Sequence, residues 1–118
     1  MALTQTATTS FKVQLLQGVH NFGPTSADTF KCALFTSAAN LGYATTQYTA
    51  GMTGEVVGTG YTEGGNELTI AVYPTSGNNS EGIPTAYITF QNVSWPGAAF
   101  TTRGALIYNV TQGNKSVA

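Results

Sequence analysis

Four glutamates lie in or beside glycine-rich loops, where carboxylates could form a hydrolytic site. They are Glu55, Glu63, Glu67 and Glu81. A glycosidase needs two carboxylates about 5–10 Å apart across a sugar, and an apolar pocket must raise the pKa of one of them. No apolar pocket is indicated around these residues. The same oxygens could bind calcium, although no D-x-D-x-D-G spacing is present.

The stretch at residues 54–70, "GEVVGTGYTEGGNELTI", could instead cradle a phosphate through its glycines. A phosphate loop needs a following lysine and the N-terminus of a helix. Here no lysine is near, and the Gly58-Thr-Gly60 pair is followed by Gly64, one residue too late for G-x-G-x-x-G. The stretch is better explained as structure: glycines where a strand bends or another backbone approaches, then a tight reversal at "EGGNE".

Nucleophilic catalysis has little support in the sequence, because no G-x-S-x-G motif is present. The single histidine, His20, lies in "GVHNFG" and is expected to bond to nearby backbone, and Asp28 is expected to be a turn or cap residue. Cys32 alternates with Phe30 and Leu34 and is expected to be buried. We therefore expect a protein that is not an enzyme and that holds no metal or cofactor.

The elements that would position these residues are short strands. Alternating apolar and polar residues predict strands at five segments, which are 11–16, 29–35, 67–73, 85–90 and 104–110. Only residues 37–50 could hold a helical turn. The prediction is an all-β fold: a single compact β-sandwich, jelly-roll or immunoglobulin-like, over residues 11–118. Residues 1–10 are predicted to be a flexible N-terminal arm that becomes ordered on a neighbour.

The charge content argues for contact with other proteins. Only 8 % of the 118 residues are charged, the net charge is −1, and the four cations are scattered singly. No basic stripe exists for nucleic acid, and no apolar run is long enough for a membrane span. Few charges also leave little repulsion to oppose self-association, so we expect a dimer or trimer. One cysteine excludes an internal disulfide, and no secretory signal precedes residue 11, so we expect synthesis in a cytoplasm.

Four segments resemble a group of small β-rich virion proteins of tailed bacteriophages. They are "FKCALFTSAANL" (30–41), "TGEVVGTGYTEGG" (53–65), "AYITFQNVSW" (86–95) and "FTTRGALIYN" (100–109). The resemblance implies a capsid cement or decoration protein on the virion surface, made in the host bacterial cytoplasm, with the major capsid protein as partner. Members of this group run on through another strand after the Tyr-Asn hairpin. Here the sequence stops at "NKSVA", so the last strand is short, pairs with a neighbour, or is incomplete.

A cement protein acts through surface residues, and seven are expected at such an interface: Thr4, Gln5, Thr6, Tyr48, Tyr61, Trp95 and Arg103. For Trp95 the alternative is closure of the sandwich core, and for Arg103 it is an ion pair with Glu55 within the chain, which we favour. A second function stays open, a carbohydrate- or receptor-binding module of a phage tail or head fibre. That module would stack sugars on Tyr61, Tyr73 or Trp95.

Overall fold

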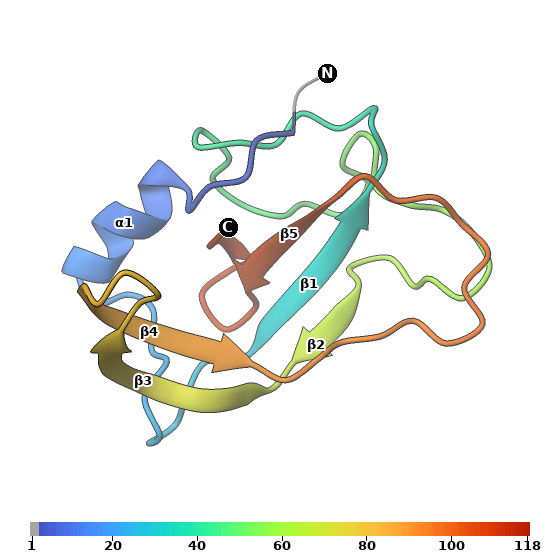
Figure 1. Cartoon of the computed structure of the whole chain (residues 1–118). Helices are drawn as coiled ribbons and strands as arrows, with labels where there is room; N and C mark the ends of the chain where they lie inside the picture. Colours follow the sequence, from blue (N-terminus) through green and yellow to red (C-terminus); the bar gives the residue numbers. More distant parts are fainter. Residues whose placement is uncertain (1–2) are drawn as a thin grey trace.

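The computed structural model describes residues 3–118, and the chain is mostly β with two antiparallel sheets (Figure 1). Its elements are α1 (Thr9–Leu16), β1 (Phe30–Phe35), β2 (Asn66–Leu68), β3 (Ile70–Asn78), β4 (Pro84–Phe90), β5 (Gly104–Asn109) and β6 (Lys115–Ser116). One sheet has the strand order β2-β1-β5-β6, and the other is the β3–β4 hairpin. Two such sheets are compatible with a sandwich. Among the described residues no helix is long and apolar enough to cross a membrane.

Strand β1 is the centre of the four-stranded sheet and is buried on both faces. The sequence predicts burial of Cys32 in alternation with Phe30 and Leu34. Ala33 and Phe35, on the other face of the strand, are also 0 % exposed. The reason is that each face is covered by its own core cluster, while β2 pairs with one edge at Phe30–Cys32 and β5 pairs with the other along the whole strand. A strand covered on both faces reads as a continuous apolar run.

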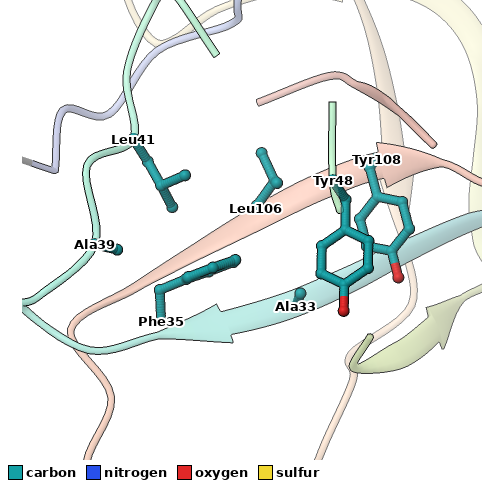
Figure 2. Close-up of a cluster of buried hydrophobic side chains, with 7 residues drawn as sticks. All are labelled: Ala33, Phe35, Ala39, Leu41, Tyr48, Leu106 and Tyr108. Atoms are coloured by element: carbon teal, nitrogen blue, oxygen red, sulfur yellow. The ribbon is translucent and has the colours of Figure 1, made fainter. Parts of the chain in front are cut away.

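The two faces carry two core clusters. Figure 2 shows the first, in which Tyr48 and residues of the preceding loop cover side chains of β1 and β5; its members are Ala33, Phe35, Ala39, Leu41, Tyr48, Leu106 and Tyr108. The second lies on the opposite face and contains Phe30, Cys32, Leu34, Val56, Leu68 and Val117. The rings of Phe90 in β4 and Phe30 in β1 pack together with their centroids 5.9 Å apart. This contact holds the base of the β3–β4 hairpin against the second cluster.

Three of the predicted strands are confirmed within about a residue, as β1, β4 and β5. The fourth, at 67–73, is divided at Thr69, so that β2 joins one sheet and β3 joins the other. Strand β3 also continues beyond residue 73, where the predicted strand ended, because it pairs with β4 as far as Asn78. Residues 37–50 form turns and isolated bridges.

The strand predicted at 11–16 is wrong, since residues 9–16 form helix α1. Thr8 caps this helix by accepting a hydrogen bond from the backbone N–H of Phe11 at 3.3 Å. The segment also contains Lys12, Gln14 and two leucines, residue types with good helix propensity. Without a neighbouring strand to pair with, local capping and propensity decide the conformation.

The N-terminal segment lies against its own domain. Thr4 donates its backbone N–H to the Leu41 carbonyl at 2.9 Å, and Thr8 donates to the Val117 carbonyl at 3.0 Å. Thr8 is 1 % exposed, and its hydroxyl lies 2.9 Å from that of Ser116. The expected arm was to become ordered on a neighbour, whereas these contacts of residues 3–10 are within one chain; residues 1 and 2 lie outside the described part.

The second glycine in "EGGNE", Gly65, is needed for a close approach of backbones. Gly65 has φ +76°, and a Cβ there would lie 1.8 Å from the Cys32 carbonyl oxygen. A side chain at this position would displace β2 from β1, so the structural explanation of the glycine stretch holds at this position.

Candidate functional site: an open strand edge beside the N-terminal segment

The carboxylate that the sequence singled out first, Glu55, is a structural acceptor. One oxygen accepts from the Tyr61 hydroxyl and from the Gly64 backbone N–H, both at 2.7 Å. The other accepts from the Tyr48 hydroxyl at 2.8 Å. Since Tyr48 belongs to the first core cluster and Tyr61 packs on the second, Glu55 ties the two clusters together at the edge of the sheet.

The tyrosines around Glu55 are held in their neutral form. Burial raises the pKa of Tyr48 and of Tyr61, and the hydrogen bond and negative charge of Glu55 raise both further. Burial, followed by the charge of Glu55, raises the pKa of Tyr108 to about 12. The neutral Tyr48 and Tyr61 hydroxyls donate to the Glu55 carboxylate, and the Tyr108 hydroxyl donates to the Gly64 carbonyl at 2.6 Å. This network stabilises the fold.

Glu55 therefore does not form the expected pair with Arg103. The two residues lie on opposite edges of β1: Glu55 bridges Phe35 on one side, and Arg103 donates its backbone N–H to the Phe35 carbonyl at 2.7 Å on the other. Arg103 is exposed. It lines a cavity instead.

This cavity, about 710 Å³ in volume, separates the N-terminal segment from the edge of β5. Arg103 is the one charged residue among its lining residues, which are Leu3, Thr4, Gln5, Thr6, Ala7, Cys32, Leu41, Arg103, Gly104, Ala105, Ile107 and Ala118. Burial raises the pKa of the Cys32 thiol to about 11, so this residue is protonated and apolar at neutral pH, as a core residue should be. The cavity thus combines apolar residues and three uncharged polar ones with one cation.

Four of the seven residues expected at an interface meet around this cavity: Thr4, Gln5, Thr6 and Arg103. The other three lie elsewhere. Tyr48 is 6 % exposed and stacks on Tyr108 with ring centroids 4.5 Å apart, so its ring is not available to a partner. Tyr61 and Trp95 are half-buried, pack against the second core cluster, and have ring centroids 6.4 Å apart.

Trp95 packs on the second core cluster, which agrees with the alternative that it closes the core. Its indole Nε1–H, however, is buried, and no described residue accepts a hydrogen bond from it. Leaving such a donor unpaired costs about 1–3 kcal/mol. Sequence reasoning had no means of detecting this group, since it depends on the packing around the ring.

A buried polar network joins the segment after α1 to the end of β5. His20 is 8 % exposed; its Nε2 lies 2.8 Å from the Gln14 amide oxygen, and its Nδ1 lies 2.9 Å from the amide nitrogen of Asn109. That nitrogen also donates to the Asp28 carboxylate at 2.8 Å. His20 therefore bonds to side chains and not, as expected, to nearby backbone. Asp28 closes the loop at 21–28 by accepting from the Asn21 N–H at 2.9 Å, so its predicted turn role is confirmed.

The β3–β4 hairpin presents a second surface, formed by strands with no charges to oppose association. Neither strand contains a charged residue, and the hairpin exposes four large apolar side chains, Val72, Tyr73, Ile83 and Tyr87, between 40 % and 51 %. In the described chain each strand pairs only with the other, so each has one open edge. Open, uncharged edges favour association with other chains.

Among residues 3–118, no group of three or more histidine, cysteine, aspartate or glutamate residues is placed to hold a metal ion. Comparisons of the chain with protein-family models, with curated proteins and with solved structures found no match.

Proposed function

We propose that this chain is a structural virion protein of a tailed bacteriophage, a cement or decoration protein that stabilises the major capsid shell by protein–protein contacts. It acts without catalysis and without a cofactor, on the capsid surface, after synthesis in the host bacterial cytoplasm. The observation that carries the proposal is the convergence of Thr4, Gln5, Thr6 and Arg103 around one open cavity. These residues come from opposite ends of the chain and were named from the sequence as interface residues.

The charge pattern supports a protein partner. Few charges, a hairpin whose two strands are uncharged and have open edges, and a cavity with one cation suit burial against another protein. A standard interface buries about 1,600 Å², and its repetition over a shell stabilises the shell by mass action. The same features favour a dimer or trimer of this chain on the capsid. We also propose that the two sheets form a sandwich of the jelly-roll or immunoglobulin-like type.

The carbohydrate- or receptor-binding alternative has weaker support. It needs a row of exposed aromatic rings, but Tyr61 and Trp95 pack against the second core cluster. Of the three residues expected to stack on sugars, Tyr73 alone is exposed, at 43 %.

The deciding experiment is co-sedimentation of the purified protein with matching capsid shells that lack it, followed by heating of the shells. Saturable binding and a higher disruption temperature are expected. Arg103→Glu should weaken binding about tenfold or more, whereas Lys12→Glu, the same charge change on the exposed face of α1, should leave it unchanged. Pelleting with host cells or their glycans and not with shells would overturn the proposal.

A further inference from the structure

The β3–β4 hairpin is a sheet of only two strands, and most of it is exposed. Its base is held by the contact between the Phe90 and Phe30 rings. Beyond that base, residues 71–78 of β3 and residues 84–87 of β4 are all exposed. A hairpin of two strands is marginally stable by itself in water, and three or more strands are needed for independent stability. The hairpin would therefore be stabilised by further strands at its edge.

The two open edges of the hairpin differ in regularity. Pairing with β4 shifts register between Ile70 and Val72 and again between Val72 and Thr75, and each shift adds a residue to β3. Strand β3 also contains Pro74, which has no N–H to donate. Bulges and proline protect an edge against pairing with another chain. Strand β4 has no added residue, and its one proline is its first residue, Pro84, so β4 carries the regular edge.

The open edge of β4 presents free backbone groups. The Gln91 N–H donates to the Thr69 carbonyl at 2.7 Å, toward the β3 side. Since the direction alternates along an antiparallel strand, Ala86 and Ile88 point their N–H and C=O groups the opposite way. No described residue outside the hairpin bonds to the backbone of either one. This edge belongs to a different sheet from the one in which residues 115–118 pair.

The absence of charge on these strands favours a second copy of the chain as the partner. A two-fold axis places a strand opposite itself, so a charged residue near the axis would meet its own equivalent and repel it. Neither strand of the hairpin contains a charged residue. Glu81 lies in the turn between the strands, and the two turns of an antiparallel pair of hairpins lie at opposite ends. A second copy thus brings an edge of equal length, regularity and neutrality, whereas a charged segment would find no counter-charge.

We propose that two copies of this chain pair through β4, antiparallel about a two-fold axis, and form one continuous sheet in the order β3-β4-β4-β3. The inference deepens the self-association in the proposed function and rests on that part of it alone. The register that uses both outward residues pairs Ala86 with Ile88 of the second copy, and it places the two Tyr87 residues opposite each other. Tyr87 is 44 % exposed, so this contact removes apolar surface from water.

The first test is sedimentation velocity of the free protein from micromolar to millimolar concentration, together with amide exchange. A dimer is expected, and exchange at Ala86 and Ile88 should slow as the concentration rises. The Ser76 amide is the internal control, because Ser76 pairs with Ala86 across the hairpin and so points to the open edge of β3. Its exchange should not change. A monomer at every concentration, or protection of Ser76 in place of Ala86, would overturn the inference.

Charges at position 87 test the two-fold axis. Tyr87→Lys and Tyr87→Glu each place like charges opposite one another, so each variant alone should dimerise about tenfold or more weakly. An equimolar mixture of the two variants should dimerise again, because opposite charges then face each other. Thr75→Lys is the matched control, since Thr75 is the neighbour of Tyr87 on β3 and lies farther from the axis. It should dimerise as the unchanged protein does. A mixture that stays monomeric would contradict the register.

The outcomes separate this inference from the proposed function. Dimers that do not bind capsid shells would keep the inference and overturn the cement role. Monomers that bind shells would overturn the inference and leave the cement role standing. Protection of Ala86 only when shells are added would assign this edge to a capsid segment and overturn the second copy as its partner. If the variants at position 87 fail to fold, the exchange measurement on the unchanged protein still decides.

Discussion

The imidazole of His20 accepts a hydrogen bond at Nδ1 from the buried amide of Asn109, at 2.9 Å. The orientation of this amide is fixed, because its oxygen accepts from the Gln112 N–H at 3.2 Å and its nitrogen also donates to Asp28. His20 must therefore be neutral, with its proton on Nε2 facing the Gln14 oxygen. A second proton on Nδ1 would face a donor.

This relationship predicts a loss of stability in mild acid. Burial lowers the pKa of His20 below its usual value near 6.5; the Asp28 carboxylate opposes that shift, and Lys115 adds to it. Between the lowered pKa and about 6.5, the unfolded chain binds more protons than the folded chain, so the free energy of unfolding falls as pH falls through this range. Urea unfolding at pH 7.5 and pH 5.5 measures the effect. His20→Gln should remove most of the difference between the two pH values; an equal difference in the variant would contradict the assignment.

Gly65 and Gly82 form a matched pair, since both have φ +76° but only Gly65 is crowded. Gly82→Ala should cost about 1 kcal/mol of unfolding free energy, from backbone strain alone. Gly65→Ala should cost about 3 kcal/mol or more, because its Cβ overlaps the Cys32 carbonyl. Urea unfolding of the two variants checks this, and equal costs would show that β2 does not pack as closely on β1 as described.

Glu55→Ala leaves the Tyr48 and Tyr61 hydroxyls and the Gly64 N–H without their acceptor. We expect a loss of about 2–4 kcal/mol of unfolding free energy. The control is Glu67→Ala, on an exposed position of β2, which should change stability by less than about 0.5 kcal/mol. Similar losses of stability in the two variants would show that Glu55 does not stabilise the junction of the two core clusters.

Thr8 connects the start of α1 to β6 through its hydroxyl, which caps the helix and lies 2.9 Å from the Ser116 hydroxyl. Thr8→Val keeps the shape and deletes both contacts, so it should cost about 1–2 kcal/mol. Thr9→Val makes the same change at an exposed position and should be near neutral. Thermal unfolding compares them, together with amide exchange at Phe11, which should become faster in Thr8→Val alone.

Local periodicity was enough to find β1, β4 and β5 and to predict that Cys32 is buried. Alternating apolar residues and flanking turn residues are properties of neighbouring positions, and they do not depend on the rest of the fold. The low content of charged residues is likewise known from the sequence alone, and it means that most of the protein surface is uncharged.

Tertiary structure decided what the pattern left ambiguous. The alternation at 11–16 fits a strand, but with no strand beside it the segment became a helix capped by Thr8. The sequence places Tyr48 in a polar, threonine-rich segment, and only the stack on Tyr108 buries it.

The cavity depended most on the tertiary structure. Its two walls, residues 3–7 and 103–107, come from opposite ends of the chain. They meet because Thr4 pairs with Leu41 and Thr8 with Val117, hydrogen bonds between residues far apart in the sequence. Arg103 and the N-terminal residues could be predicted as interface residues from their types. Only contacts between distant parts of the chain bring them around one cavity. Local spacing carries no information about such contacts, since it constrains only residues within a few positions of one another.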